Sequence, residues 1–340
     1  MAFKKLKVKV GQVTGTHTNF PTLIQPSLIT GLGSITLAEA QSARFYSDVG
    51  KTTEIAREIV SADEIHVKVT SMEALAEIWM DYDGIRADYA TTATYGAENV
   101  WGNYEIVHHL NEYESTITNS TGNTGGTPFN LGSGDEVAGK IAGGLSLLNN
   151  DDYISTPSDS LNSFTLQLIF KKDGSSGLVQ DGLIERTTGI GNYSKLQLIR
   201  LRSDGTVALM SRNGISAQNI EFLSTSTVVD NNWRFIHATL ESGAQKIFID
   251  GAQDASDTKT QSSNTLDTNF FINSTYDSTA RFPKGMYDEV RVRTSTLSAN
   301  WITTEYNNQN ANGSFWEATD AGGGGSTPAQ AARRGVVMMM

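Results

Sequence analysis

Apolar and polar residues alternate over short stretches along much of the chain, which is the period of a β-strand with one buried face. The clearest early example is EIHVKV, where every second residue from Ile65 to Val69 is apolar. The stretch SMEALAEIWMDYDG at 71–84 has the composition of a short helix, but its apolar residues also alternate from Ala76 to Met80. We therefore predict a loop that enters a strand there, within a small β-rich domain.

Beyond Tyr104 the pattern becomes a series of strand-like runs separated by Asp-Gly, Asn-Gly and Ser-Gly pairs. Such pairs favour tight turns, and helical periodicity is almost absent. Many even strands joined by tight turns predict an all-β sandwich or jelly roll. The clearest runs are FTLQLIF, KLQLIRLR, VALMS, RFIHATLE and QKIFIDG.

Composition limits the classes of protein to which the chain can belong. The 340 residues are 38% hydrophobic, which suits one or two globular domains, and two are expected. The absence of cysteine excludes disulfides, thiolate metal sites and a cysteine nucleophile. No apolar run approaches the roughly 20 residues of a membrane span, and we find no signal peptide at the start of the sequence. The sequence thus predicts no membrane partner.

A net charge of -11 argues against nucleic acid as a partner, because most of the surface would repel phosphates. The lysines of the first ten residues are the basic cluster at the N-terminus. Their alternation in KLKVKV instead predicts an edge strand whose lysines face water and discourage unwanted strand pairing.

The chain changes character after Trp316, where TDAGGGGSTPAQAARRGVVMMM begins with a flexible linker composition. Its apolar end follows Arg333 and Arg334. We expect residues 319–340 to form a Gly-rich tail that ends in a detachable docking peptide.

Residues 105–310 resemble LamG-like domains of the concanavalin A-like superfamily, in the family's order of motifs. The segments that carry this resemblance are HLNEYESTITNSTGNTGGT (109–127), VAGKIAGGLSLLNNDDYIS (137–155), NNWRFIHATLESGAQKIFIDGAQDA (231–255) and MYDEVRVRTSTLSANWITTEYNNQN (286–310). The resemblance implies a jelly-roll sandwich over residues 105–318.

Residues 1–104 resemble the DUF2341 domain, which often precedes LamG domains. The matching segments are HTNFP (17–21), ARFYSDVGKTTEIAREIV (43–60) and the EIHVKV strand. This pair of domains, with no signal peptide and a short Arg-containing apolar tail, is similar to structural proteins of tailed-bacteriophage virions. That resemblance implies localisation in the virion and, as partners, other copies of the chain, capsid or tail proteins and host-surface glycans.

Catalysis is not expected, although glycoside hydrolases also use this fold. They need two carboxylates that flank the scissile bond, and their usual Glu-x-Asp-x-x-Glu run is absent here. Asp288 and Glu289 are adjacent, so they should lie on opposite faces of a strand. His108 and His109 are adjacent too, which is poor geometry for chelating one metal, and with His237 we assign them structural roles.

The resemblance also implies a Ca²⁺ site between the opening loop and the final Asp-Glu strand. If the family's site is carried over to this sequence, its ligands would be Asp288, Asn123 and Asn119. At the position of Asn119 the family commonly has aspartate. Oxygen ligands of this kind suit Ca²⁺. In the alternative, the two asparagines cap a turn, and Asp288 pairs with Arg281 or Lys284.

Sugar recognition usually needs an exposed aromatic ring close to amide and carboxylate groups. Loop residues could supply it, and strand tryptophans such as Trp233 and Trp301 are assigned to packing. The candidate ligand-binding residues are Tyr193, Tyr276, Tyr287 and Phe282.

The sequence therefore predicts a non-enzymatic virion structural protein that displays a lectin-like domain. The alternative is an extracellular carbohydrate-binding adhesin module, and a glycoside hydrolase ranks third. Whether the protein belongs to the head or the tail, how many copies associate, and which glycan is bound are left open.

Overall fold

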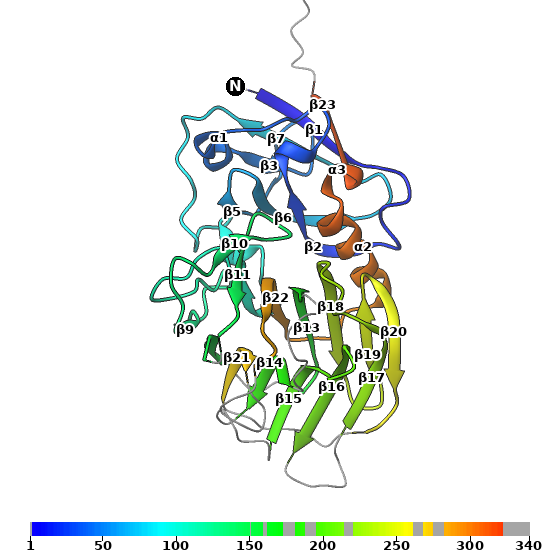
Figure 1. The fold of residues 1–340 in the computed structure, drawn as a ribbon. Helices are drawn as coiled ribbons and strands as arrows, with labels where there is room; N and C mark the ends of the chain where they lie inside the picture. The colour runs from blue at the N-terminus through cyan, green and yellow to red at the C-terminus, as the bar shows by residue number, and fades with distance from the viewer. Residues whose placement is uncertain are drawn as a thin grey trace, which may run out of the picture.

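The structure is a computed structural model that describes residues 2–149, 151–158, 162–172, 181–187, 195–213, 220–260, 268–274 and 282–321. Strands dominate it, and Figure 1 shows a smaller N-terminal unit set against one end of a larger sandwich. Within the described residues, no helix is long and apolar enough to cross a membrane.

The N-terminal unit contains two small antiparallel sheets that share one apolar core. The first sheet has the order β23-β1-β7-β3-β4, and its strands are Trp316–Asp320, Ala2–Val8, Glu77–Tyr82, Arg44–Tyr46 and Glu54–Ile55. The second has the order β2-β6-β5, with strands His17–Ile24, Glu64–Met72 and Arg57–Ser61. The short helix α1 (Leu37–Ser42) begins with a capping box formed by Thr36 and Glu39.

Strand β1 is not the edge strand that its lysines predict. It lies between β7 and β23, because the end of the described chain returns and pairs with it. Lys4 forms an ion pair with Asp320 at 2.7 Å, and Lys5 forms one with Glu77 at 3.1 Å. These lysines thus meet carboxylates on the neighbouring strands. The predicted boundary at residue 318 falls inside β23, which belongs to the N-terminal unit.

The sandwich consists of two antiparallel sheets. The larger runs β10-β11-β22-β13-β18-β19-β20, and β8 also pairs with β22; in that order the strands are Glu136–Ala138, Gly143–Leu147, Gly285–Arg293, Phe164–Lys171, Arg234–Leu240, Gln245–Ile249, Ala252–Asp257 and, for β8, Tyr104–His108. The other runs β17-β16-β15-β14-β21-β12-β9, with strands Ile220–Thr227, Thr206–Asn213, Lys195–Leu201, Asp181–Thr187, Thr268–Ser274, Tyr153–Ser158 and Thr127–Phe129. The all-β prediction is confirmed.

Alternate residues of the central strands fill the space between the two sheets, as the sequence pattern predicts. Leu166, Leu168 and Phe170 of β13 are buried in this core. The intervening residues of β13 are also buried, because the outer face of the larger sheet is covered as well. Gln167, for example, donates a hydrogen bond to Gln309 of the covering helix at 3.2 Å.

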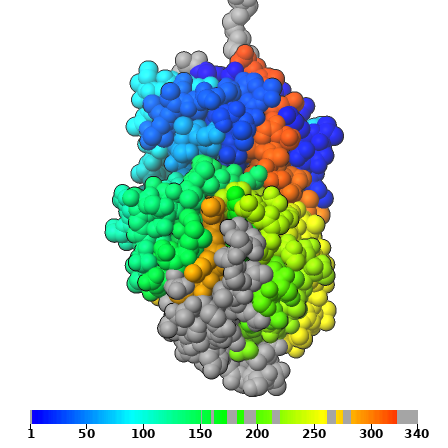
Figure 2. Space-filling model, viewed as in Figure 1, coloured from blue at the N-terminus to red at the C-terminus, as the bar shows by residue number. Residues whose placement is uncertain are grey.

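That helix, α2 (Ala299–Asn310), runs along one side of the molecule from the sandwich toward the N-terminal unit, and α3 (Asn312–Phe315) lies beside the N-terminal strands, as the orange-red segment of Figures 1 and 2 shows. Trp301 packs against Phe20 of β2 at 4.8 Å between ring centroids. The side chains of Asn308 and Asn312 bind the backbone carbonyl of Leu23. The N-terminal unit therefore completes its core with C-terminal residues.

Strand β22 contains an irregularity that matters for the site. Its pairing with β13 shifts register between Gln167 and Ile169, and Glu289 has a φ of 51°. A non-glycine residue seldom adopts this left-handed backbone, which costs energy and marks a bulge. The bulge breaks the strict alternation of the strand, and because both faces of this sheet are covered, Tyr287 to Val292 are all buried.

A pH effect on stability follows from Glu185 of β14. Burial raises its pKa to about 7, although a hydrogen bond from Ser274 Oγ at 2.6 Å opposes the shift. Between its unfolded value near 4.5 and about 7, the folded state keeps a proton that the unfolded state releases. Stability should therefore fall by about 3 kcal/mol as the pH rises through this window.

Urea unfolding at a series of pH values tests this expectation. Glu185→Gln should flatten the decline between pH 5 and about 7.5, because the amide does not titrate. Glu136→Gln, at an exposed position of β10, is the matched control and should keep the wild-type slope. An unchanged slope in the Glu185 variant would contradict the assignment.

Candidate functional site

The structure places the predicted calcium residues Asn119 and Asn123 in one hydrogen-bond network and Asp288 in another. Asn119 Oδ1 accepts from the backbone N–H of Val107 at 3.1 Å, and Asn119 Nδ2 donates to the carbonyl of Glu105 at 3.2 Å. Asn123 Nδ2 also donates to the carbonyl of Glu105, at 3.0 Å. Both asparagines thus tie the opening loop to β8, and Asn119 Oδ1 also accepts from the backbone N–H of Thr121 within its own turn, at 3.3 Å.

Asp288 is fully buried, and its Oδ2 accepts the backbone N–H of Ile141 at 2.7 Å. Its Oδ1 has no hydrogen-bond partner. Burial and the nearby carboxylates of Glu289 and Glu64 raise the pKa of Asp288 well above its usual value. No ion pair with Lys284 is found in the described part of the chain, and Arg281 lies outside it. The Ca²⁺ site stays a prediction.

The predicted sugar-binding aromatics are not exposed where the structure describes them. Tyr287 belongs to β22, has no exposed surface, and donates its hydroxyl to Asn273 Oδ1 at 3.0 Å. Phe282 is 3% exposed. Both correct the expectation of loop rings open to solvent, because Tyr287 packs in the core of the sandwich and Phe282 packs near Tyr153, with 6.4 Å between ring centroids. Tyr193 and Tyr276 lie outside the described residues.

An exposed aromatic surface lies elsewhere on the sandwich, at the edge of the smaller sheet. Phe129 of β9 is 39% exposed and stacks on Tyr153 of β12, with 4.3 Å between centroids and 13° between planes. The neighbouring Asn130 donates to Asp151 at 3.1 Å and to Asp152 at 2.9 Å. A ring, an amide and an exposed carboxylate thus lie together; we call these residues the aromatic platform.

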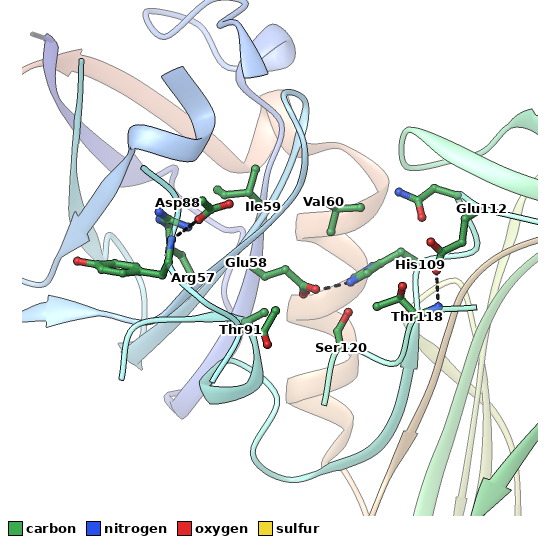
Figure 3. Close-up of a pocket in the computed structure, with 13 residues that line it drawn as sticks. Arg57, Glu58, Ile59, Val60, Asp88, Thr91, His109, Glu112, Thr118 and Ser120 are labelled. Atoms are coloured by element: carbon green, nitrogen blue, oxygen red, sulfur yellow. Dashed lines mark hydrogen bonds and ion pairs between the residues drawn. The ribbon is translucent and has the colours of Figure 1, made fainter. Parts of the chain in front are cut away.

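A polar pocket of about 250 Å³ lies between the N-terminal unit and the sandwich (Figure 3). The N-terminal unit contributes one wall, where Arg57 forms an ion pair with Asp88 at 2.6 Å. The sandwich contributes Glu112, whose carboxylate accepts the backbone N–H of Thr118. The lining residues are Arg57, Glu58, Ile59, Val60, Asp88, Tyr89, Thr91, Ala97, His109, Asn111, Glu112, Thr118 and Ser120.

Glu58 and His109 meet across this pocket, with 3.1 Å between Glu58 Oε2 and His109 Nε2 (Figure 3). On the far side of the ring, His109 Nδ1 lies 2.5 Å from Glu289 Oε1 and 3.1 Å from Glu64 Oε1. The ring of His66 stacks on that of His109, with centroids 4.7 Å apart. We call Glu64, His66, His109 and Glu289 the junction cluster; all four are buried.

The carboxylates decide the charge of His109. Burial lowers its pKa, but Glu289, Glu58 and Glu64 together raise that pKa well above its ordinary value. Burial raises the pKa of Glu289, yet the charges of Arg291 and His109 hold it well below its usual range. Without another cation, His109 is therefore an imidazolium that donates to carboxylates from both ring nitrogens.

Sequence reasoning missed the junction cluster but predicted one part of its geometry. Adjacent residues do point apart: His108 binds Thr156 Oγ1 at 2.8 Å, whereas His109 faces the carboxylates. Glu64 and His66 are two residues apart on β6, so their shared face was readable from EIHVKV. The approach of Glu289 to these residues could not be read from the sequence, because it depends on the bulge and on contacts between distant segments.

Arg291 should be a strong determinant of stability, because it is the buried counter-charge of two carboxylates. It binds Glu289, and its Nη1 donates to Glu305 Oε1 of α2 at 2.9 Å. Arg291→Met should lower the free energy of unfolding by about 3–5 kcal/mol, since it removes the guanidinium that two buried carboxylates share. Arg293→Met is the control on the same strand. Because Arg293 is half-buried, its substitution should lower the free energy of unfolding far less. Equal losses in urea unfolding would contradict this role.

Comparison with known proteins bears on the sandwich. Residues 148–303 match the family model described as the concanavalin A-like lectin/glucanases superfamily. A search of curated proteins finds no match.

Among solved structures, domain 4 of the arabinanase AbnA from Geobacillus stearothermophilus, in complex with arabinotriose, is 19% identical with a TM-score of 0.49; the match covers 59% of this chain and 97% of that one. A structure of botulinum neurotoxin type C, a toxin whose cell entry depends on two ganglioside molecules, is 12% identical with a TM-score of 0.48. That match covers 62% of this chain and 52% of the toxin chain. The CBM40 of the Ruminococcus gnavus IT-sialidase, bound to α2,3-sialyllactose, is 15% identical with a TM-score of 0.38. That match covers 47% of this chain and 94% of the CBM40 chain.

Scores and identities at this level establish no ligand for this chain. The family match and the two packed sheets agree with the resemblance seen in the sequence. The sandwich therefore has the concanavalin A-like jelly-roll fold, and it is joined to an N-terminal β unit.

Proposed function

We propose that the protein is a non-catalytic virion structural protein that binds glycans on a host surface through its concanavalin A-like domain. The observation that carries the glycan part is the aromatic platform of Phe129 and Tyr153 beside Asn130 and Asp151. The matching family model, which covers lectins and glucanases, supports the same class of ligand.

The platform has the chemistry that a sugar ring requires. The C–H face of a sugar packs on an aromatic ring, while its hydroxyls exchange hydrogen bonds with amides and carboxylates. Phe129 is already held by stacking on Tyr153, so little side-chain entropy is lost when a ligand binds. Asp151 is exposed and can accept from hydroxyls.

The virion part of the proposal rests on the sequence resemblance of residues 1–104 and 105–310 to paired domains of phage structural proteins. The net charge of -11 suits a particle surface that stays dispersed. The partners in this proposal are other copies of the chain and capsid or tail proteins. The competing assignment is an extracellular adhesin module that binds glycans without any particle.

Phe129→Ala should weaken glycan binding about tenfold, because it removes the stacking face. A glycan array first identifies a ligand for the wild-type protein, and calorimetry then compares variants. Leu223→Ala is the matched control, since Leu223 is also 39% exposed but lies on β17, at the other edge of the same sheet. Equal affinity of the Phe129 variant and the wild type would remove the platform from the proposal.

Electron microscopy of the protein, alone and mixed with phage particles from the same source, tests the virion role. Ordered symmetric oligomers or decorated particles are the expected result. A monodisperse monomer that does not bind the particles, yet binds a glycan on the array, would favour the adhesin assignment. The two measurements thus separate glycan binding from assembly.

A further inference from the structure

We propose that the junction cluster binds one divalent transition-metal ion, for which Zn²⁺ is the best fit. Each of its four residues offers one ligand atom, and these atoms all lie within 4.8 Å of one another. The proposal concerns residues other than the aromatic platform, so it goes beyond glycan binding and does not depend on it.

The distances between ligand atoms have the size that a tetrahedral site needs. Glu64 Oε1 lies 3.1 Å from His109 Nδ1 and 3.2 Å from His66 Nε2. Metal–ligand bonds of about 2.0–2.1 Å in a tetrahedron separate neighbouring ligand atoms by about 3.3 Å. Glu289 Oε1 would move away from His109 Nδ1, because the hydrogen bond of 2.5 Å between them would give way to two bonds to the ion.

The outer partners are those of a metal centre. Histidines that bind a metal commonly donate their other N–H to a carboxylate, which fixes the ring. His109 has this arrangement, with Nδ1 in the cluster and Nε2 facing Glu58. Glu58 is held in turn by the indole N–H of Trp101 at 2.6 Å. The second oxygen of Glu289 is held by Arg291, which leaves Oε1 directed at the cluster.

The carboxylate of Glu64 independently points to a missing cation, through the oxygen other than the Oε1 of the distances above. Glu64 has no exposed surface, and its Oε2 has no hydrogen-bond partner. A buried carboxylate oxygen without a partner is costly, and a cation bound to Glu64 would offset that cost. The cluster is also rich in negative charge, since Glu58, Glu64 and Glu289 are close together and Arg291 is shared with Glu305.

The ligand set selects the kind of ion. Two imidazoles with two carboxylates suit Zn²⁺ and its transition-metal neighbours, whereas Ca²⁺ and Mg²⁺ prefer oxygen ligands alone. Because Glu58 and His109 line the pocket of Figure 3, an ion has a polar route to the cluster. Bound there, it would join Glu64 and His66 of the N-terminal unit to His109 and Glu289 of the sandwich.

The test uses the full chain without an affinity tag, stripped with a chelator and then titrated with Zn²⁺. We expect one Zn²⁺ per chain and a higher melting temperature, because the ion binds the folded state alone. Co²⁺ should bind in place of Zn²⁺ and give the intense visible absorption of a tetrahedral site. X-ray absorption on the Zn²⁺-loaded wild-type chain should find two imidazole ligands, and this measurement needs no variant.

Glu64→Gln keeps the size of the side chain and should weaken Zn²⁺ binding more than tenfold. Glu58→Gln, which changes the partner of His109, should weaken it about 10- to 100-fold. His17→Gln is the matched control: His17 is also buried, but it binds Thr304 away from the cluster and should leave uptake unchanged. Circular dichroism confirms that each variant is folded.

Three results would overturn the proposal. The first is a folded wild-type chain that takes up neither Zn²⁺ nor Co²⁺ at micromolar free metal, which would leave His109 as a purely ionic link among carboxylates. The second is uptake that Glu64→Gln does not change or that X-ray absorption assigns to oxygen ligands alone. Uptake of Ca²⁺ in place of Zn²⁺ would equally reject a site with two imidazole ligands.

Discussion

The structure depends on the burial of polar and charged side chains on the outer face of the larger sheet. The register places Arg291, Gln167 and His237 side by side across β22, β13 and β18. Helix α2 covers this row and supplies Glu305, which lies 2.9 Å from Arg291 and 3.4 Å from His237. Buried charges are tolerated only when they are paired in good geometry, so they fix how the helix sits on the sheet.

The same constraint extends to the junction of the two units. Glu289 binds Arg291 on one side and His109 on the other, so the outer face of the sheet and the junction cluster form one continuous network. Its charges cannot be separated without exposing or unpairing several of them. The relative position of the N-terminal unit and the sandwich is therefore set by specific ion pairs as well as by apolar contact.

Chain connectivity reinforces this arrangement. After β22 the chain passes through α2 and α3 and then adds β23 to the N-terminal sheet beside β1. The first and last described strands are thus neighbours, and the core of the N-terminal unit includes Phe315, which precedes β23, and Phe248 of the sandwich strand β19. The aromatic platform lies at the edge of the smaller sheet of the sandwich and shares no residue with the junction cluster.

The sequence by itself determined the all-β class, the jelly-roll sandwich and the opposite orientations of His108 and His109. These follow from local periodicity, turn residues and family motifs, which act within a few residues of each other. Tertiary structure alone decided that β1 is internal, that Tyr287 is buried, and that Glu64, His66, His109 and Glu289 converge. The physical reason is that long-range packing decides which strands pair, where the bulge at Glu289 forms and how residues 64 and 289 come into contact. The period-2 alternation of the sequence does not encode such packing.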